Sequence, residues 1–146
     1  MKFFTKVIII LIFFNSFSIF SSCNHEDVIP YIEFYESVYL NLPQYQSVQT
    51  PGNYIYLPSP QFGYAGVILY CKFPDEYIAY ERNCPYNASK EDAILDISDS
   101  LNLMVCRNCG SRFSLMDGGK VSGPAKYDAK RYNTTLQNGN KLDIYN

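Results

Sequence analysis

Three cysteines and one tyrosine in the middle of the chain have side chains and a spacing that could do chemistry. Cys84 and Tyr86 belong to a Cys-Pro-Tyr motif, and Cys106 and Cys109 form a Cys-x-x-Cys pair that begins 22 residues after Cys84. Thiolates bind soft metal ions and iron–sulfur clusters, and paired thiols can form a disulfide or act as a redox couple. The one histidine of the chain is His25, near the N-terminus, so the chain cannot supply two His ligands to a metal site.

A zinc site and a redox dithiol are two interpretations that these residues support by themselves. Structural zinc takes four ligands, and the three cysteines lack a His or a fourth Cys close to them. Cys71 does not complete the set, because it lies well back in a predicted strand and is typical of a small core residue. A thioredoxin-type pair has its first cysteine at the start of a helix, whereas the residues after Cys109 predict a strand. The sequence therefore favours neither.

The chain around these cysteines has the pattern of an all-β protein. Tyrosine and phenylalanine are abundant, with 14 and 10 residues, and no segment shows a convincing helical period. Between residues 31 and 42, apolar side chains fall mostly at every second position, which places one face of a strand on the core. The predicted strands span 31–42, 53–57, 66–71, 77–81, 93–97, 101–105, 111–115, 120–121, 132–136 and 142–145.

Two pairs of predicted strands lead into the cysteines. Residues 66–71 and 77–81 flank a Pro-Asp turn, and the second strand of this hairpin delivers Cys84 to a first loop. Residues 93–97 and 101–105 form another pair, which delivers Cys106 to a second loop. We therefore expect both cysteines at the ends of strands.

From about residue 66 to 145, the order of these signals resembles the Rieske iron–sulfur family. The motifs that carry the resemblance are Asn-Cys-Pro-Tyr at 83–86, Cys-x-x-Cys-Gly-Ser-x-Phe at 106–113 and Ser-Gly-Pro-Ala at 122–125. The resemblance implies an all-β, Rieske-like antiparallel β-sandwich with a small cluster-binding-type subdomain, whose loops span about 83–91 and 106–113. It also implies a turn beneath the cluster at Gly110, a covering loop at Pro124, and neighbours of the ligands at Ser111 and Phe113.

Departures from the family pattern leave two functions open. Rieske proteins bind one iron through two Cys and the other through two His, and here Tyr86 and Cys109 stand at the His positions. In the first interpretation, Cys84, Cys106 and Cys109 hold a [2Fe–2S] cluster, with Tyr86 as a candidate fourth ligand. Anionic ligands in place of imidazoles would lower the reduction potential, so the protein would be a low-potential electron carrier.

In the second interpretation the cluster has been lost. The family geometry places Cys84 and Cys106 on the same iron, so a disulfide from Cys84 to Cys106 or Cys109 would pin the loops together in an exported protein. The sequence favours this cluster-free binding or structural domain, without a cofactor. No second His is available, and Phe113 lacks the hydroxyl with which a Tyr there donates to a ligand sulfur. Neither interpretation predicts an enzyme.

The N-terminus predicts an exported lipoprotein. Two lysines precede an apolar run that is too short to span a membrane and that ends at Ser21-Ser22-Cys23. We interpret residues 1–22 as a lipoprotein signal peptide, Cys23 as the lipid-bearing residue, 23–30 as a tether and 31–146 as a single domain. An ordinary secretory signal is the alternative. The predicted location is the bacterial cell envelope, with the protein lipid-anchored on the periplasmic or outer-membrane side.

The charge balance argues against one class of partner. Without residues 1–22 the chain has 10 basic and 14 acidic residues, a net charge of −4, and nothing suggests nucleic acid. The predicted partners are the membrane, through the lipid on Cys23, and an envelope protein or redox partner. The acidic residues between the two loops, Glu91, Asp92, Asp96 and Asp99, predict a solvated connection.

Overall fold

The computed structural model describes residues 28–98 and 101–146. The predicted signal peptide (1–22), the predicted lipid site Cys23 and most of the tether (23–30) lie outside the described residues, and so does Asp99. Within the described ranges, no helix is long and apolar enough to span a membrane.

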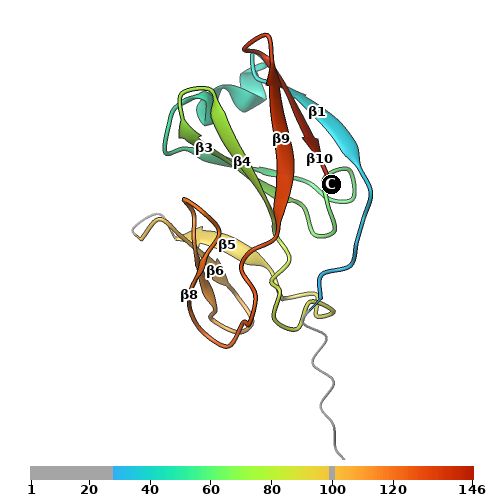
Figure 1. The fold of residues 1–146 in the computed structure, drawn as a ribbon, viewed down its shortest axis with the longest axis vertical. Helices are drawn as coiled ribbons and strands as arrows, with labels where there is room; N and C mark the ends of the chain where they lie inside the picture. Colours follow the sequence, from blue (N-terminus) through green and yellow to red (C-terminus); the bar gives the residue numbers. More distant parts are fainter. Residues whose placement is uncertain (1–27, 99–100) are drawn as a thin grey trace, which may run out of the picture.

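Ten strands in two antiparallel sheets make up almost all of the regular structure in the described residues (Figure 1). In chain order the elements are β1 (Tyr35–Tyr39), the 3₁₀ helix η1 (Pro43–Gln49), β2 (Tyr54–Leu57), β3 (Val67–Phe73), β4 (Glu76–Glu81), β5 (Leu95–Ser98), β6 (Leu103–Cys106), β7 (Arg112–Ser114), β8 (Lys120–Ser122), β9 (Arg131–Gln137) and β10 (Lys141–Tyr145). The larger sheet has the order β1-β10-β9-β4-β3-β2, and the smaller has the order β5-β6-β7-β8. The predicted all-β class is confirmed, and a small sheet beside a larger one is consistent with a Rieske-like fold.

The larger sheet curls around its own hydrophobic core. β1 and β2 are its two edge strands, yet Val38 of β1 and Leu57 of β2 belong to the same buried cluster. Leu69 of β3 and Leu142 of β10 complete the contact between the two halves. Edge strands can share one core only if the sheet bends back on itself. The two layers of the predicted sandwich are therefore halves of one sheet, β1-β10-β9 and β4-β3-β2.

β3 contributes side chains to both cores of the molecule. Val67, Leu69 and Cys71 are buried inside the curled sheet, whereas Ile68 and Tyr70 are buried in the second core, beneath the small sheet. Successive side chains of a strand point to opposite faces, so a strand covered on both faces is apolar throughout. A shift of β3 by one residue would exchange these two sets of side chains between the two cores. Burial of both faces therefore fixes the pairing register of β3.

The small sheet packs on the outer face of β3 and β4. Leu95, Met104 and Phe113, one from each of β5, β6 and β7, join Ile78 and Tyr80 of β4 in the second core. Each fully buried side chain of this size stabilises the fold by roughly 1.5–3 kcal/mol. This packing fixes the ends of β4 and β6, from which the cysteine loops begin.

The N-terminal part of the domain differs from the sequence prediction in two places. The predicted strand 31–42 forms a regular ladder only over β1, because the partner strand β10 begins opposite Tyr39 and ends opposite Tyr35. The helix η1 then forms where no helix was expected. Pro43 presets the φ angle that a first helical turn requires. Only Val48 of this helix is buried, so the segment has no apolar helical period to be recognised.

Candidate metal centre

The two cysteine loops begin at neighbouring strand ends. Cys84 follows β4, and its N–H donates to the carbonyl of Ala93 at 2.7 Å. Cys106 is the last residue of β6, and its N–H donates to the carbonyl of Ser111 at 2.9 Å. Gly110 turns the chain between Cys106 and Ser111. Its φ is +71°, and its N–H donates to the carbonyl of Cys106 at 3.0 Å. The turn expected at Gly110 is therefore present.

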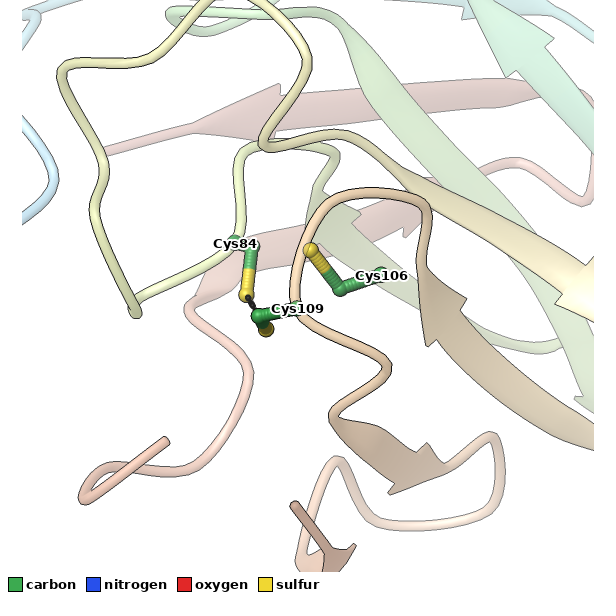
Figure 2. A group of neighbouring side chains, drawn as sticks. All are labelled: Cys84, Cys106 and Cys109. Carbon is green, nitrogen blue, oxygen red and sulfur yellow. Dashed lines mark hydrogen bonds between the residues drawn. The ribbon is translucent and has the colours of Figure 1, made fainter. Parts of the chain in front are cut away.

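Three sulfur atoms meet where these loops come together (Figure 2). The Sγ atoms of Cys84, Cys106 and Cys109 all lie within 4.8 Å of one another. The Sγ atoms of Cys84 and Cys109 are 3.8 Å apart. Cys84 and Cys106 are buried and Cys109 is partly exposed, so solvent reaches the group from the side of Cys109.

The spacing of the sulfurs fits a shared metal ion better than a disulfide. Two thiolates bonded at about 2.3 Å to one tetrahedral ion stand about 3.8 Å apart, which is the Cys84–Cys109 separation. A disulfide requires sulfurs at about 2.0 Å. The four cysteines of the described residues are all free thiols, so the predicted disulfide from Cys84 to Cys106 or Cys109 is not found there.

The thiols of Cys84 and Cys106 shift each other's acidity in opposite directions. The hydrogen bond with Cys106, followed by burial, raises the pKa of the Cys84 thiol. The same hydrogen bond is the main cause of a lowered pKa at Cys106, and backbone N–H groups of Cys109 and Asn108 lower it further against the opposing effect of burial. The pair therefore favours one thiolate, which is the form that binds metal ions.

The Ser-Gly-Pro-Ala segment at 122–125 packs against the second loop. Ala125 N–H donates to Ser111 Oγ at 3.1 Å, and Cys109 Sγ donates to the same oxygen at 3.1 Å. The N–H of Ser111 donates in turn to Cys109 Sγ at 3.4 Å. Gly123 approaches so closely that a Cβ there would lie 2.5 Å from Ser111 Cα. Pro124 stands between these two contacts, beside the thiol loop.

The remaining predicted site residues lie at different depths. Tyr86 is partly buried and packs against the core of the small sheet. Phe113 is fully buried in that core and has no hydroxyl to donate to a sulfur. Within residues 28–98 and 101–146, no His, Asp or Glu joins the three sulfurs. The candidate metal ligands that the structure brings together are thus Cys84, Cys106 and Cys109.

Polar contacts that the sequence analysis missed tie the second loop to the small sheet. Asp96 Oδ1 accepts from Arg82 Nη2 at 2.9 Å, and Asp96 Oδ2 accepts from Arg107 Nε. Asn108 Nδ2 donates to Asp92 Oδ2 at 2.6 Å. Asp92 and Asp96 therefore bind the Cys-x-x-Cys loop instead of being simply solvated. The β5–β6 hairpin sets position 96 beside position 105, so its register could have suggested the Asp96–Arg107 pair.

A buried carboxylate, also missed, fixes the start of the first loop. Glu81 is fully buried, and its two oxygens accept four hydrogen bonds. The donors are the N–H groups of Tyr64 (2.7 Å), Ala65 (2.9 Å) and Asn83 (2.9 Å) and the hydroxyl of Tyr132 (2.5 Å). Asn83 also spans the loop, because its Nδ2 donates to the carbonyl of Ala88 at 3.1 Å. The residue before Cys84 is thus held from two sides.

Comparison with known proteins adds one structural similarity. No protein-family model matches the chain, and no curated protein matches it. Among solved structures, the fold is similar to a chain of the complex of reduced oxygenase and oxidized ferredoxin in carbazole 1,9a-dioxygenase. The TM-score is 0.49 at 15% sequence identity, and the match covers 78% of this chain and 94% of that chain. The chemistry of the site therefore rests on this chain's own residues.

Proposed function

We propose that this protein is an electron carrier whose iron is held by the thiolates of Cys84, Cys106 and Cys109. The observation that carries the proposal is the convergence of these three sulfurs, from two loops, within 4.8 Å. Thiolates are the usual protein ligands of iron–sulfur clusters, and a bound [2Fe–2S] cluster supplies one-electron transfer.

The donor set fits such a cluster in chemistry and falls one ligand short in number. It is also grouped more tightly than the Rieske pattern, because Cys84 and Cys109 stand at the separation of two ligands on one ion. The three thiols supply three of the four ligand positions. We assign the fourth to Tyr86, which comes from the same loop as Cys84 and stands where the Rieske pattern has a His. Because Cys109 is the exposed member of the group, electrons would enter and leave on its side.

The surroundings of the thiols favour a low reduction potential. Thiolates add negative charge where a Rieske site has neutral imidazoles, and reduction adds a further negative charge. Burial of Cys84 and Cys106 opposes that added charge. Backbone N–H groups act the other way, those of Cys109 and Asn108 on Cys106 and that of Ser111 on Cys109, whereas Phe113 offers no hydroxyl. We therefore expect a potential below that of His-ligated Rieske centres.

A cluster-free binding or structural domain is the second candidate, and one observation favours it. The loops are held by contacts that involve no metal. These include Asp96 with Arg107, Asp92 with Asn108, and Ser111 with Ala125. Such a site would keep its shape after losing its metal, and it would do so without the disulfide that the sequence suggested.

We further propose that the protein is a lipoprotein of the bacterial cell envelope, anchored through Cys23. The support is the Ser-Ser-Cys junction after a short apolar run with two preceding lysines. Wild-type protein should incorporate palmitate and partition with membranes, while Cys23→Ala should do neither. A soluble, unlabelled wild type would remove the anchor and leave an ordinary secreted protein.

Protein prepared and measured without air distinguishes the two functions. We expect a brown protein with about two irons per chain and a low-potential reducible signal. Cys106→Ala should abolish the signal. Cys71→Ala is the matched control, because Cys71 is a buried free thiol of β3 outside the sulfur group, and this variant should keep the signal. A colourless wild type, after iron and sulfide have been supplied, would favour the cluster-free domain.

A further inference from the structure

A groove lies where the chain enters the domain. Its volume is about 330 Å³, and its apolar lining consists of Val28, Ile29, Tyr31, Pro85 and Tyr127. Val28, Tyr31 and Tyr127 expose 69%, 71% and 58% of their surfaces. Their gathering at one groove makes this part of the exterior a candidate contact surface.

The groove must lie close to a lipid on Cys23. Val28 is five residues beyond Cys23, and an extended chain of that length spans at most about 18 Å. A domain of this size is about 35 Å across, because its radius of gyration is about 13 Å. The groove is therefore on the side of the domain that faces the anchoring membrane.

The β3–β4 turn lies toward the opposite end of the molecule (Figure 1). The six residues of β4 separate this turn from the loop of Cys84, which corresponds to about 20 Å of extended strand. Phe73, next to the turn, is 51% exposed and provides a reference position far from the groove.

The side chains of the groove suit a lipid headgroup layer. Tyr31 and Tyr127 combine an apolar ring with a polar hydroxyl, as do the aromatic residues enriched at membrane interfaces. Lys130 also lines the groove, with its Nζ 5.7 Å from the ring centroid of Tyr31 and 5.0 Å from that of Tyr132. Its stem can stay on these rings while the ammonium group reaches lipid phosphates. Asp128, the acid at the groove, accepts a hydrogen bond from the N–H of Lys120 at 2.8 Å.

We propose that this groove rests on the phospholipid bilayer that holds the lipid of Cys23. The inference depends on the lipid anchor proposed above, and it adds an orientation. Pro85 lines the groove and directly follows Cys84, so the thiol loops are held at the membrane surface. A redox partner would then meet the thiol site at the bilayer instead of from free solution.

Single tryptophans test this orientation, because the chain contains none. The lipidated mature chains of Tyr127→Trp and Phe73→Trp are reconstituted into vesicles of phosphatidylethanolamine and phosphatidylglycerol, with and without brominated acyl chains. Brominated chains quench tryptophan at the interface, and an interfacial residue reaches about 5–10 Å into the headgroup boundary. We expect at least about a twofold loss of emission for Tyr127→Trp and none for Phe73→Trp. Tyr31→Trp is a second groove probe if Tyr127→Trp fails to fold.

Quenching of neither probe, or of Phe73→Trp alone, would overturn the proposed orientation. Equal quenching of both would overturn it as well, because the domain would have no fixed face toward the bilayer. Palmitate labelling of the same samples reports the anchor, so an unlabelled protein would remove the anchor and the groove's role together. Iron content is measured separately, and its absence would contradict the electron carrier without affecting this result.

Discussion

The large sheet and the thiol loops both bury reactive side chains, and they satisfy them in different ways. In the large sheet, the carboxylates of Glu81 and Asp143 are fully buried, and each has four partners. Those of Asp143 are the hydroxyls of Tyr35 (2.6 Å) and Ser37 (2.7 Å), the amide of Gln137 (2.6 Å) and the ammonium of Lys141 (3.0 Å). In the loops, three thiols lie at the spacing of metal ligands and are close partners of one another.

The difference shows which buried group holds the fold together and which one can take a ligand. A buried polar group with a full set of protein partners stabilises the native state and has little capacity for anything else. Three thiols gathered within 4.8 Å gain most when one cation neutralises their thiolates together. The carboxylates are therefore structural, and the sulfur group is where we expect a ligand.

The largest effect on folding should come from Glu81→Gln. An amide has one acceptor oxygen, and its NH₂ group would face N–H donors that the carboxylate now accepts. Leaving buried donors without a partner should lower the free energy of unfolding by about 3 kcal/mol or more, measured by urea denaturation. A loss below about 1 kcal/mol would remove the structural role of Glu81.

A smaller effect, of about 2 kcal/mol, is expected for Gly123→Ala. Its φ is +97°, and the added Cβ would meet Ser111 Cα at 2.5 Å, so the 122–125 segment must move away from the thiol loop. Gly139→Ala is the matched control, because its φ is +66° and nothing lies within 4 Å of the added Cβ. We expect reduced iron loading only at position 123. Equal loading of the two variants would show that this segment does not support the site.

Acid should weaken the large sheet through Asp143. Hydrogen bonds from Tyr35, Ser37 and Lys141 lower the pKa of Asp143 to about 2 in the folded protein, compared with about 3.9 in an unfolded chain. Its contribution is therefore fully present above about pH 4 and is lost as the pH falls toward 2. Asp143→Asn should be less stable than wild type at pH 7, and the gap should narrow in acid. A constant gap between pH 7 and pH 2 would contradict this assignment.

The smallest effect on stability is expected for Asp96→Asn. This carboxylate is partly exposed, so loss of its pairs with Arg82 and Arg107 should cost about 0.5–1 kcal/mol. Because Arg107 belongs to the Cys-x-x-Cys loop, a chelator should remove iron faster from this variant. Glu76→Gln breaks the Lys72–Glu76 surface pair, remote from the loops, and should leave the release rate unchanged. Equal release rates would show that the Asp96 contacts do not hold the loop closed.

Local sequence patterns predicted most strands because the information lies within a few residues. The turn at Asn138 and Gly139, for example, has φ angles of +52° and +66°, the left-handed conformation that these residue types favour. The curl of the large sheet was not visible in the same way. It depends on Val38 and Leu57 meeting from opposite edges, and no local pattern encodes such a contact.

The same contrast holds at the site. The positions of Cys84, Cys106 and Cys109 could be predicted, because each follows from a strand end and a short motif. The contacts of Glu81 could not, since its partner Tyr132 is 51 residues away and a single glutamate in a strand has no pattern of its own. The sequence also could not predict that the cysteines are free thiols instead of the expected disulfide. Whether two cysteines pair depends on the distance between their loops.

Native mass spectrometry of the protein, loaded with iron and sulfide without air, tests most directly whether the sulfur group is a ligand site. Wild type and Cys71→Ala should carry the added mass of about two irons and two sulfides, and Cys84→Ala and Cys106→Ala should be bare. Wild type and the three variants should all give the compact charge states of a folded chain, since the carboxylates of the large sheet are intact. A bare wild type, or Cys84→Ala loaded as fully as wild type, would contradict the assignment of these thiols as iron ligands.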